Sequence, residues 1–427
     1  MIIHVVQPLE TIQSIATKYN LPVDKIILDN ELPNPNNLVL GQTIVILYPK
    51  EIYTVQDGDS IISIANNFGV SPMQLLRNNP SLINREFIYP GETIVISFVD
   101  EKIGPIATNG YTYPFIDKDI LRKTLPFLTY LTIFAYGVTK EGNLLDINDS
   151  EIIQMTKDFG VAPIMLITLT TNQRIFSSDV THSILSSREK QEFLIDNILN
   201  MLKTKGYYGL NIDSGYLLLE DKDPFVNFLN LLTTRLNSEG FIVICTLTPQ
   251  TFIVSNFKEL DYTSIGRVVN RVILLSYEWG FSFGPPLSVT SYDLVRQFLD
   301  EAIIQISPDK IFLGIPSIGY NWQLPYIENV SKVYSVSNRA AINLAVEVGA
   351  TIFFDELLQA PHFHYFDDST GVSVPHIVWF KDARSINSLV KFVPDYGLYG
   401  VGIWNIMSFF AQLWIVINSQ YEIISVL

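Results

Sequence analysis

Eight short apolar runs separated by stretches of helical character constrain this chain more than any other feature of its sequence. The runs are rich in Ile, Val, Leu and Tyr, and amphipathic segments such as 188–203 and 292–305 lie between them. Strands that read as continuously apolar and alternate with helices indicate a parallel (β/α)8 barrel, an α/β fold. The eight runs are 106–111, 130–135, 162–169, 209–213, 241–247, 272–277, 311–316 and 400–405.

The gap between the last two runs is too long for an ordinary barrel connection. About 80 residues separate them, whereas connections within α/β units are short. We therefore expect a small α+β insertion after strand 7, at about 317–397, in a barrel domain that spans 104–427.

The first 98 residues contain a repeat of about 50 residues. His4-Val-Val-Gln7 matches Tyr53-Thr-Val-Gln56, and Gly41-Gln-Thr-Ile-Val-Ile46 matches Gly91-Glu-Thr-Ile-Val-Ile96. Each repeat reads as strand, helix, helix, strand, with Ser60 and Ser71-Pro72 as helix starts in the second repeat. We predict two small βααβ modules, at 1–49 and 50–98.

The repeat resembles LysM modules. The resemblance is carried by Gly58-Asp59, Asn78-Asn79-Pro80 and Tyr89-Pro90-Gly91, and module one departs from it with Pro8-Leu9 in place of Gly58-Asp59. It implies binding of glycans that contain N-acetylglucosamine, such as peptidoglycan or chitin. In module two the implied contacts lie in loops 57–60 and 81–89, and in module one in loops 7–11 and 33–38. The alternative is that one or both modules are spacers. The candidate glycan-binding residues are Asp57, Gly58, Asp59, Ser60, Asn84 and Tyr89.

The net charge argues against one class of partner, and the cysteine count argues against a disulfide. The net charge is −15 and no Lys/Arg-rich run occurs, so a nucleic-acid partner is not expected. The single Cys245 lies in an apolar run and cannot form an intrachain disulfide, so it reads as a buried structural thiol.

The apolar stretch 413–417 is too short to cross a membrane, and Met1-Ile-Ile-His4 does not read as a secretion signal. We expect neither a membrane partner nor conventional export.

Polar residues at the carboxyl ends of the barrel strands are the candidates for chemistry. The fourth run ends in Asn211-Ile-Asp213, the sixth in Tyr277-Glu278-Trp279 and the eighth in Trp404. The part of the chain from about 104 to 427 resembles the family 18 glycoside hydrolases, especially the LysM-containing spore cortex-lytic N-acetylglucosaminidases. The matching blocks are 211–213, 276–279 with 284–286, 314–316 with 319–322, 359–363, 378–384 and 400–404.

The resemblance implies a substrate-assisted mechanism that needs an Asp-x-Glu pair after strand 4. In that mechanism the Glu protonates the leaving oxygen while the acetamido group of the substrate attacks the anomeric carbon. Asp213 matches the orienting aspartate, but Gly215 stands where the proton donor belongs. Hydrolysis of the glycosidic bond is therefore expected to fail, unless another acid such as Glu220 or Glu278 takes the role of the missing proton donor.

Other positions that match the family imply sugar binding. Tyr277 is expected to hydrogen-bond the acetamido group. Tyr277 and Asp213 are therefore the two catalytic residues that the resemblance implies. Trp404 is expected to form the apolar floor under the sugar ring. The remaining candidates for the cleft are Asn211, Glu278, Trp279, Asn321 and Trp322.

A metal site is the less favoured interpretation of the histidines in the insertion. His362 and His364 would share one strand face, and His376 lies nearby in sequence, but no Cys or carboxylate pattern accompanies them. We expect no metal and no cofactor.

The sequence as a whole predicts a glycan-binding protein of the spore or cell wall with an inactive hydrolase-like barrel, made in a bacterial mother-cell cytoplasm. The alternatives are an active N-acetylglucosaminidase with a non-standard acid, and a structural coat or wall protein. The sequence does not indicate which glycan is bound, or the oligomeric state.

Overall fold

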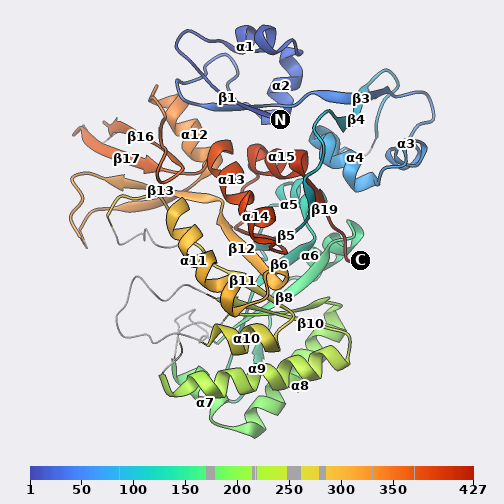
Figure 1. The fold of residues 1–427 in the computed structure, drawn as a ribbon, viewed down its shortest axis with the longest axis vertical. Helices are drawn as coiled ribbons and strands as arrows, with labels where there is room; N and C mark the ends of the chain where they lie inside the picture. Colours follow the sequence, from blue (N-terminus) through green and yellow to red (C-terminus); the bar gives the residue numbers. More distant parts are fainter. Residues whose placement is uncertain are drawn as a thin grey trace.

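The computed structural model describes residues 1–85, 87–169, 178–213, 217, 219–247, 261–277, 285–328, 330–369 and 371–427. Two small modules, a barrel and an inserted sheet make up the fold (Figure 1). The N-terminal modules lie beside each other at one side of the barrel, and the inserted sheet stands next to them.

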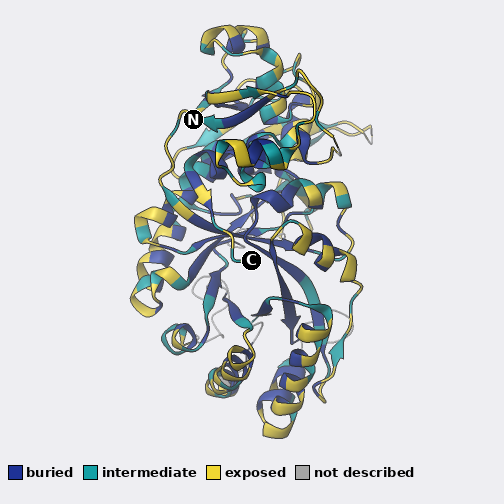
Figure 2. Cartoon of the chain, turned by 90° about the vertical axis from the view of Figure 1, so that its right-hand side faces the viewer, coloured by how far each residue is buried: buried dark blue, intermediate teal, exposed yellow. Residues whose placement is uncertain are grey.

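The barrel consists of eight parallel strands that close on themselves, because β5 pairs with both β18 and β6. All eight predicted strands are confirmed, and their side chains form the buried centre of the domain (Figure 2). In barrel order the strands are β5 Gly104–Thr112, β6 Tyr130–Val138, β8 Ala162–Thr168, β9 Gly209–Asp213, β10 Ile242–Leu247, β11 Arg271–Leu274, β12 Ile311–Pro316 and β18 Gly400–Trp404. Two short strands, β7 Leu144–Leu145 and β19 Tyr421–Ile423, pair with β6 and β5.

Helices surround the barrel. The predicted helices at 188–203 and 292–305 are confirmed as α8 and α11. The barrel helices are α5 Lys118–Thr124, α6 Ser150–Asp158, α7 Ser178–Leu185, α8 Arg188–Lys205, α9 Lys222–Ser238, α10 Tyr262–Val268, α11 Tyr292–Gln305, α13 Ala383–Val390, α14 Phe392–Tyr396 and α15 Ala411–Gln420. Short 3-10 turns are η2 Leu125–Phe127, η3 Leu219–Asp221 and η4 Pro308–Lys310.

The insertion after strand 7 is an antiparallel five-stranded sheet in the order β14-β13-β17-β16-β15, with one helix. Its elements are β13 Ile318–Gln323, β14 Val333–Ser337, α12 Asn338–Glu347, β15 Phe353–Asp355, β16 Ala360–Asp367 and β17 Val374–Trp379. The added sheet therefore ends at Trp379. The rest of the expected 317–397 range forms α13 and α14, which pack with α15 and α11 in the helical ring.

Each N-terminal module is a two-stranded antiparallel sheet with two helices, as predicted. Module one contains β1 Ile2–Val5, α1 Ile12–Tyr19, α2 Val23–Asn30 and β2 Thr43–Ile46. Module two contains β3 Pro49–Thr54, α3 Ile61–Phe68, α4 Pro72–Asn78, η1 Pro80–Leu82 and β4 Thr93–Phe98. Thr11 and Ser60 begin α1 and α3 with reciprocal capping bonds, and Ser71 caps α4.

One asparagine at the end of the second helix fastens each module together, and it is buried in module one and partly buried in module two. In module one the Asn30 amide donates to the Val45 carbonyl (2.8 Å) and accepts from the Val45 N–H (2.7 Å). In module two Asn79 makes the same pair of bonds with Val95, both 2.8 Å long. Each also donates to the carbonyl four residues earlier in its helix or turn. The repeat therefore extends to individual hydrogen bonds.

The first loop of module one corrects the alignment of the repeats. Leu9 (φ 67°), not Pro8, occupies the left-handed position of Gly58 (φ 84°). Glu10 then takes the place of Asp59, because each carboxylate accepts the N–H of the glutamine three residues earlier. Pro8-Leu9 therefore corresponds to Asp57-Gly58, one residue away from the alignment expected from the sequence.

Both modules dock on α15, which is buried along its length. Gln412 exchanges two hydrogen bonds with Thr43 of module one (2.7 and 2.6 Å). Asn418 donates to Asn78 of module two (3.1 Å). Because α15 is buried on every side, it needs neighbours all round, and here the modules cover the side away from the barrel. None of the described helices is long and apolar enough to cross a membrane.

Candidate functional site

The candidate site of the barrel lies at the carboxyl ends of its strands. Asp213 is the last residue of β9, half-buried, and it stands opposite Thr168 of β8 and Thr246 of β10. Trp404 is the half-buried last residue of β18. The structure thus places both residues at the end of the barrel where the sequence predicted them. Gly215, Glu278 and Trp279 lie outside the described residues.

Three buried side chains form a triangle of hydrogen bonds inside the barrel, directly beneath Asp213. The Asn211 amide donates to the Tyr111 hydroxyl (3.0 Å), and the Thr246 hydroxyl donates to the Asn211 amide oxygen (2.9 Å). The hydroxyls of Tyr111 and Thr246 are 3.0 Å apart. Asn211, which the sequence assigned to the cleft, has no exposed surface in this structure. It instead holds three strands in register one layer beneath Asp213.

Burial makes this lower layer resistant to ionisation. It raises the pKa of the Tyr111 phenol, which is further raised by the charge of Asp213 although its hydrogen bonds to Thr246 and Asn211 act the other way. Burial, with Asp213 nearby, also raises the pKa of the Cys245 thiol. The Cys245 thiol is therefore protonated at neutral pH and unsuited to act as a nucleophile.

Tyr277 is nearly buried and packs against β12. A Cβ atom at Gly314 would lie 3.0 Å from a ring carbon of Tyr277 and 2.7 Å from the Leu274 carbonyl oxygen. Only glycine leaves room for the ring at this point. The Gly314 position in the sequence motif is therefore explained by the placement of Tyr277.

Trp404 belongs to an aromatic cluster that sequence reasoning did not identify. Its ring meets Tyr111 and Phe134 edge-on at 5.4 Å each, and Tyr113 at 6.2 Å. Tyr113 in turn stacks on Phe115, which is exposed. The missed signal was the aromatic residues that end the first two predicted strands. Together these rings make an apolar floor and wall suited to the C–H faces of a sugar.

Two predicted cleft residues of the inserted sheet have other roles. Trp322, which the sequence assigned to the cleft, has no exposed surface and packs in a core cluster of the sheet. Asn321 donates to the Tyr365 hydroxyl (2.8 Å) and its amide oxygen lies 2.8 Å from His376 Nδ1. Its amide therefore joins strands within the sheet.

The alternative acid Glu220 is exposed and lies beside His182 (3.6 Å). His182 also contacts the buried Asp221 (2.9 Å), which together with Glu220 raises the pKa of the imidazole. Among the described residues, no group of three or more His, Cys, Asp or Glu side chains could hold a metal ion.

In module two the predicted residues divide into structural and exposed ones. The Asp59 carboxylate accepts from the Gln56 N–H (2.7 Å) and the Tyr53 hydroxyl (2.8 Å), and Ser60 caps α3. These two residues shape the loop. Asp57, Gly58, Asn84 and Tyr89 are exposed, as is Phe87, which sequence reasoning missed.

The two loops of module two lie side by side. The Gly91 N–H donates to the Val55 carbonyl and the Val55 N–H to the Glu92 carbonyl, each at 2.9 Å. The turn that carries Tyr89 is therefore next to the strand end that leads into the Asp57 loop. Arg85 lies over the Tyr89 ring (5.4 Å) and pairs with Glu92 (2.7 Å), which holds the turn in place.

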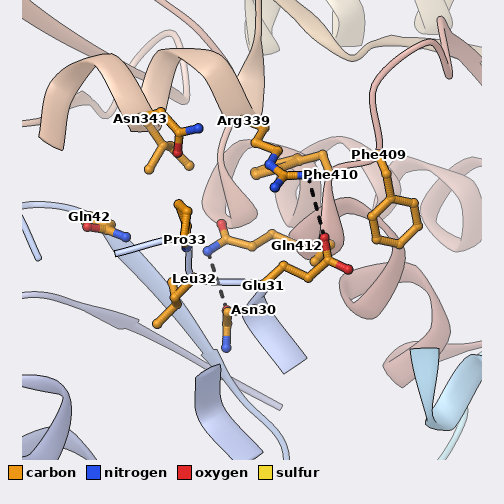
Figure 3. A pocket seen from close by; sticks show the side chains of 12 residues that line it. Asn30, Glu31, Leu32, Pro33, Gln42, Arg339, Asn343, Phe409, Phe410 and Gln412 are labelled. Carbon is orange, nitrogen blue, oxygen red and sulfur yellow. Dashed lines mark hydrogen bonds and ion pairs between the residues drawn. The ribbon is translucent and has the colours of Figure 1, made fainter. Parts of the chain in front are cut away.

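A separate pocket lies where module one, α12 and the segment before α15 meet (Figure 3). Its charged side chains are Glu31 and Arg339, which lie 3.9 Å apart, and Glu31 also pairs with Lys123. Gln412 points toward Asn30 across the pocket (3.5 Å). The polar lining therefore serves to dock module one on the barrel and insertion.

Comparison with known proteins agrees with this arrangement. The sequence model described as Glycosyl hydrolases family 18 matches residues 152–408, and that of the LysM domain matches 4–47 and 53–97. The chain is 30% identical over 433 residues to the cortical fragment-lytic enzyme of Bacillus subtilis (strain 168), covering 99% of each chain. It is 30% identical over 421 residues to the cortical fragment-lytic enzyme of Bacillus anthracis, covering 97% of each.

Among solved structures, the spore cortex-lytic enzyme SleL of Bacillus megaterium QM B1551 is similar over the whole fold. The TM-score is 0.83 at 30% sequence identity, and the alignment covers 100% of this chain and 99% of the other. The likeness therefore includes the modules as well as the barrel.

Proposed function

Since this chain belongs to the glycosyl hydrolases of family 18 and carries two LysM domains, we propose that it binds N-acetylglucosamine glycans of the peptidoglycan or chitin type without hydrolysing them. The observation that carries the proposal is Gly215, two residues after Asp213, where a proton donor is needed. Glycine has no ionisable group. Loss of a positioned general acid typically costs about 10²- to 10⁴-fold in rate.

The rest of the barrel mouth supports binding. Asp213 and Tyr277 are the polar groups proposed for the acetamido group of the sugar. Trp404, with the rings around it, offers the apolar floor. Module two adds exposed Phe87 and Tyr89 beside its two loops. Several weak sites on one chain raise the avidity for a polymeric glycan.

An active N-acetylglucosaminidase is the second candidate. It is favoured by full-length similarity to enzymes named cortical fragment-lytic. It would need a different acid. Glu220 is exposed and lies in η3, beside His182 and beyond the end of β9. Glu220 therefore does not stand at the position that Gly215 occupies.

The proposed location is the spore or cell wall. The similar proteins are named for the spore cortex or its fragments, and LysM domains suit attachment to a wall polymer. A structural role in a coat or wall is the remaining alternative, in which the barrel would bind no sugar at all.

Restoring the acid tests the proposal. Gly215→Glu and the uncharged control Gly215→Gln should be compared with the natural chain for release of reducing ends from peptidoglycan and from N-acetylglucosamine oligomers. We expect background rates for the natural chain and the Gln variant, and a gain of about 10²-fold or more for the Glu variant. Robust turnover by the natural chain that Glu278→Gln abolishes would establish a relocated acid and overturn the proposal.

Binding is tested separately by sedimentation with insoluble peptidoglycan and chitin. The full chain should cosediment, and Phe87→Ala combined with Tyr89→Ala should weaken that retention. A chain that stays in solution with both polymers would leave only the structural alternative.

A further inference from the structure

The pocket where module one, α12 and the start of α15 meet holds an excess of positive charge (Figure 3). Glu31 is the carboxylate of this group, and it faces both Lys123 and Arg339. Lys123 pairs closely with one oxygen of Glu31 and lies over the Phe409 ring (4.8 Å). Two cations therefore share one carboxylate, in a protein whose net charge is −15.

Arg339 is the cation that this pairing leaves incompletely satisfied. Its Nη1 atom lies 3.9 Å from Glu31, which is too long for a hydrogen bond. In the described part of the chain, no other side chain pairs with its guanidinium. The Arg339 side chain is 46% exposed, so a ligand can reach it. A guanidinium presents N–H donors in a planar fork that fits a carboxylate.

Asn343 places a neutral donor beside this guanidinium. Arg339 and Asn343 are four residues apart in α12 and therefore lie on the same face of the helix. Both line the pocket. The amide of Gln412 is instead used for docking, because it donates to the Thr43 carbonyl (2.6 Å). Docking of module one therefore leaves Arg339 and Asn343 available to a ligand.

The size of the pocket limits the ligand to a small group. The space that it encloses is about 30 Å³, which accepts one small polar group but not a pyranose ring. Its wall includes the apolar side chains of Pro33, Ile342 and Phe410. A carboxylate with a short apolar group beside it suits both the excess charge and this wall.

We propose that this pocket binds a carboxylate of peptidoglycan, held by Arg339 with Asn343 beside it. The proposal rests on the proposed glycan-binding function and deepens it by naming the polymer. Peptidoglycan carries carboxylates on its lactyl groups and on its short peptides, whereas chitin carries none. Pairs between a guanidinium and a carboxylate are stronger than hydrogen bonds between neutral groups. The pocket therefore favours peptidoglycan, although both polymers present N-acetylglucosamine to the rest of the protein.

The test compares ligands with and without carboxylates on the full chain. Calorimetry should use soluble peptidoglycan fragments that keep their peptides, the same fragments after an amidase has removed the peptides, the released peptides, and the hexamer of N-acetylglucosamine. The variants are Arg339→Gln, Glu31→Gln and the control Arg235→Gln. Arg235 is also 46% exposed and pairs with a carboxylate, that of Asp196 (2.9 Å), on the helices around the barrel.

The two pocket variants should act in opposite directions. Arg339→Gln should weaken the binding of peptide-bearing fragments roughly three- to tenfold, because it removes the charged donor. Glu31→Gln should strengthen that binding about twofold or more, because the two cations lose their competing carboxylate. The hexamer affinity should stay the same in every variant, and the control should change nothing. A loss that persists after amidase treatment assigns the carboxylate to the lactyl group, and a loss confined to intact fragments assigns it to the peptide.

Weaker binding in both pocket variants, or an equal loss for the hexamer, would show that these charges serve only to dock module one and would overturn the proposal. Unchanged binding by Arg339→Gln would overturn it as well. A natural chain that binds neither the fragments nor the hexamer overturns the proposed function. The carboxylate site then stands only if the released peptides bind and Arg339→Gln weakens their binding, and otherwise it fails too.

Discussion

The two N-terminal modules have the same fold and the same internal hydrogen bonds, but they meet the barrel differently. Besides its side-chain contacts with Gln412, module one meets the inserted lobe through its backbone: the Ile352 N–H donates to the Leu40 carbonyl (2.9 Å), and Gly41 lies against the Ile352 carbonyl. Module two is docked by a side chain, since buried Arg77 donates to the Pro126 carbonyl (2.8 Å). The two modules therefore share their internal structure but differ in their contacts with the rest of the protein.

The difference bears on which module is free to bind a glycan. The turn before β2 of module one is held by the inserted lobe through Leu40 and Gly41. The equivalent turn of module two is open, because a Cβ atom at Gly91 would meet nothing within 4 Å. Module two also exposes Phe87 and Tyr89 near this turn. We infer that module two is the better placed of the pair for sugar binding, and that module one contributes mainly to the assembly of the fold.

The largest expected effect tests what the modules share. Asn30→Ala and Asn79→Ala each remove the same three hydrogen bonds within the module and leave buried backbone groups unpaired, so each should lower the free energy of unfolding by about 3 kcal/mol. Urea unfolding would measure the loss. The exposed Asn84→Ala is the control, with a change below about 0.5 kcal/mol. Losses below about 1 kcal/mol in both modules would show that the asparagines do not fasten them.

The second prediction tests what the modules do not share. Gly41 and Gly91 both have positive φ, 84° and 90°, so alanine strains either backbone by about 1–2 kcal/mol. At Gly41 the new Cβ would also lie 1.8 Å from the Ile352 carbonyl oxygen. Gly41→Ala should therefore cost at least about 1 kcal/mol more than Gly91→Ala in the same unfolding assay. It should also make the junction of module one with the barrel more sensitive to limited proteolysis. Equal losses at the two positions would argue against backbone docking.

The third prediction exchanges the residues of the first loops. Leu9 is 100% exposed and has φ 67°, so its side chain makes no contact that offsets the backbone strain. Leu9→Gly should stabilise the chain by about 0.5–1 kcal/mol, and Gly58→Ala should destabilise it by about 1 kcal/mol. Thermal unfolding would resolve the opposite signs. Destabilisation by Leu9→Gly would instead reveal a contact of the Leu9 side chain.

The smallest effect concerns the loop carboxylates. Burial raises the pKa of Glu10, but hydrogen bonds from the Gln7 N–H and His4 outweigh it, and the net pKa lies below 4.5. A carboxylate with a lowered pKa in the folded state stabilises it above the unfolded pKa, and this is lost as pH falls through the folded pKa. Relative to Glu10→Gln, the natural chain should be more stable by about 0.5 kcal/mol at pH 7. The difference should shrink below about pH 4.5, the ordinary pKa of a glutamate. A difference that grows on acidification would contradict this assignment.

Local sequence patterns predicted the elements well because their causes are local. Continuous apolar runs and helical periodicity depend on neighbours along the chain, and all eight barrel strands followed from them. Helix starts at Ser60 and Ser71 followed from side chains that bond the next turn. The position of Asp213 and Trp404 followed from the parallel strand order, which brings all strand carboxyl ends to one side.

The roles of single side chains were predicted less well. Asn211 and Asp213 are two residues apart on one strand, so their side chains lie on the same face. Asn211 is nevertheless covered by Tyr111 and Thr246 from other strands. Trp322 resembles a cleft residue in sequence, but its surroundings come from strands up to 57 positions later, such as Trp379. Whether a residue is covered depends on distant elements, and a single sequence carries no record of them.

By itself the sequence determined the repeated modules, the barrel, the inserted lobe and the presence of Gly215 two residues after Asp213, because periodicity, caps and residue identity are properties of the chain alone. Only the tertiary structure decided that α15 is covered by both modules, that module one is docked by the inserted lobe, and that Asn211 and Trp322 have no exposed surface. The physical reason is that packing brings together surfaces far apart along the chain, and exposure, docking and alignment of rings exist only once those surfaces meet.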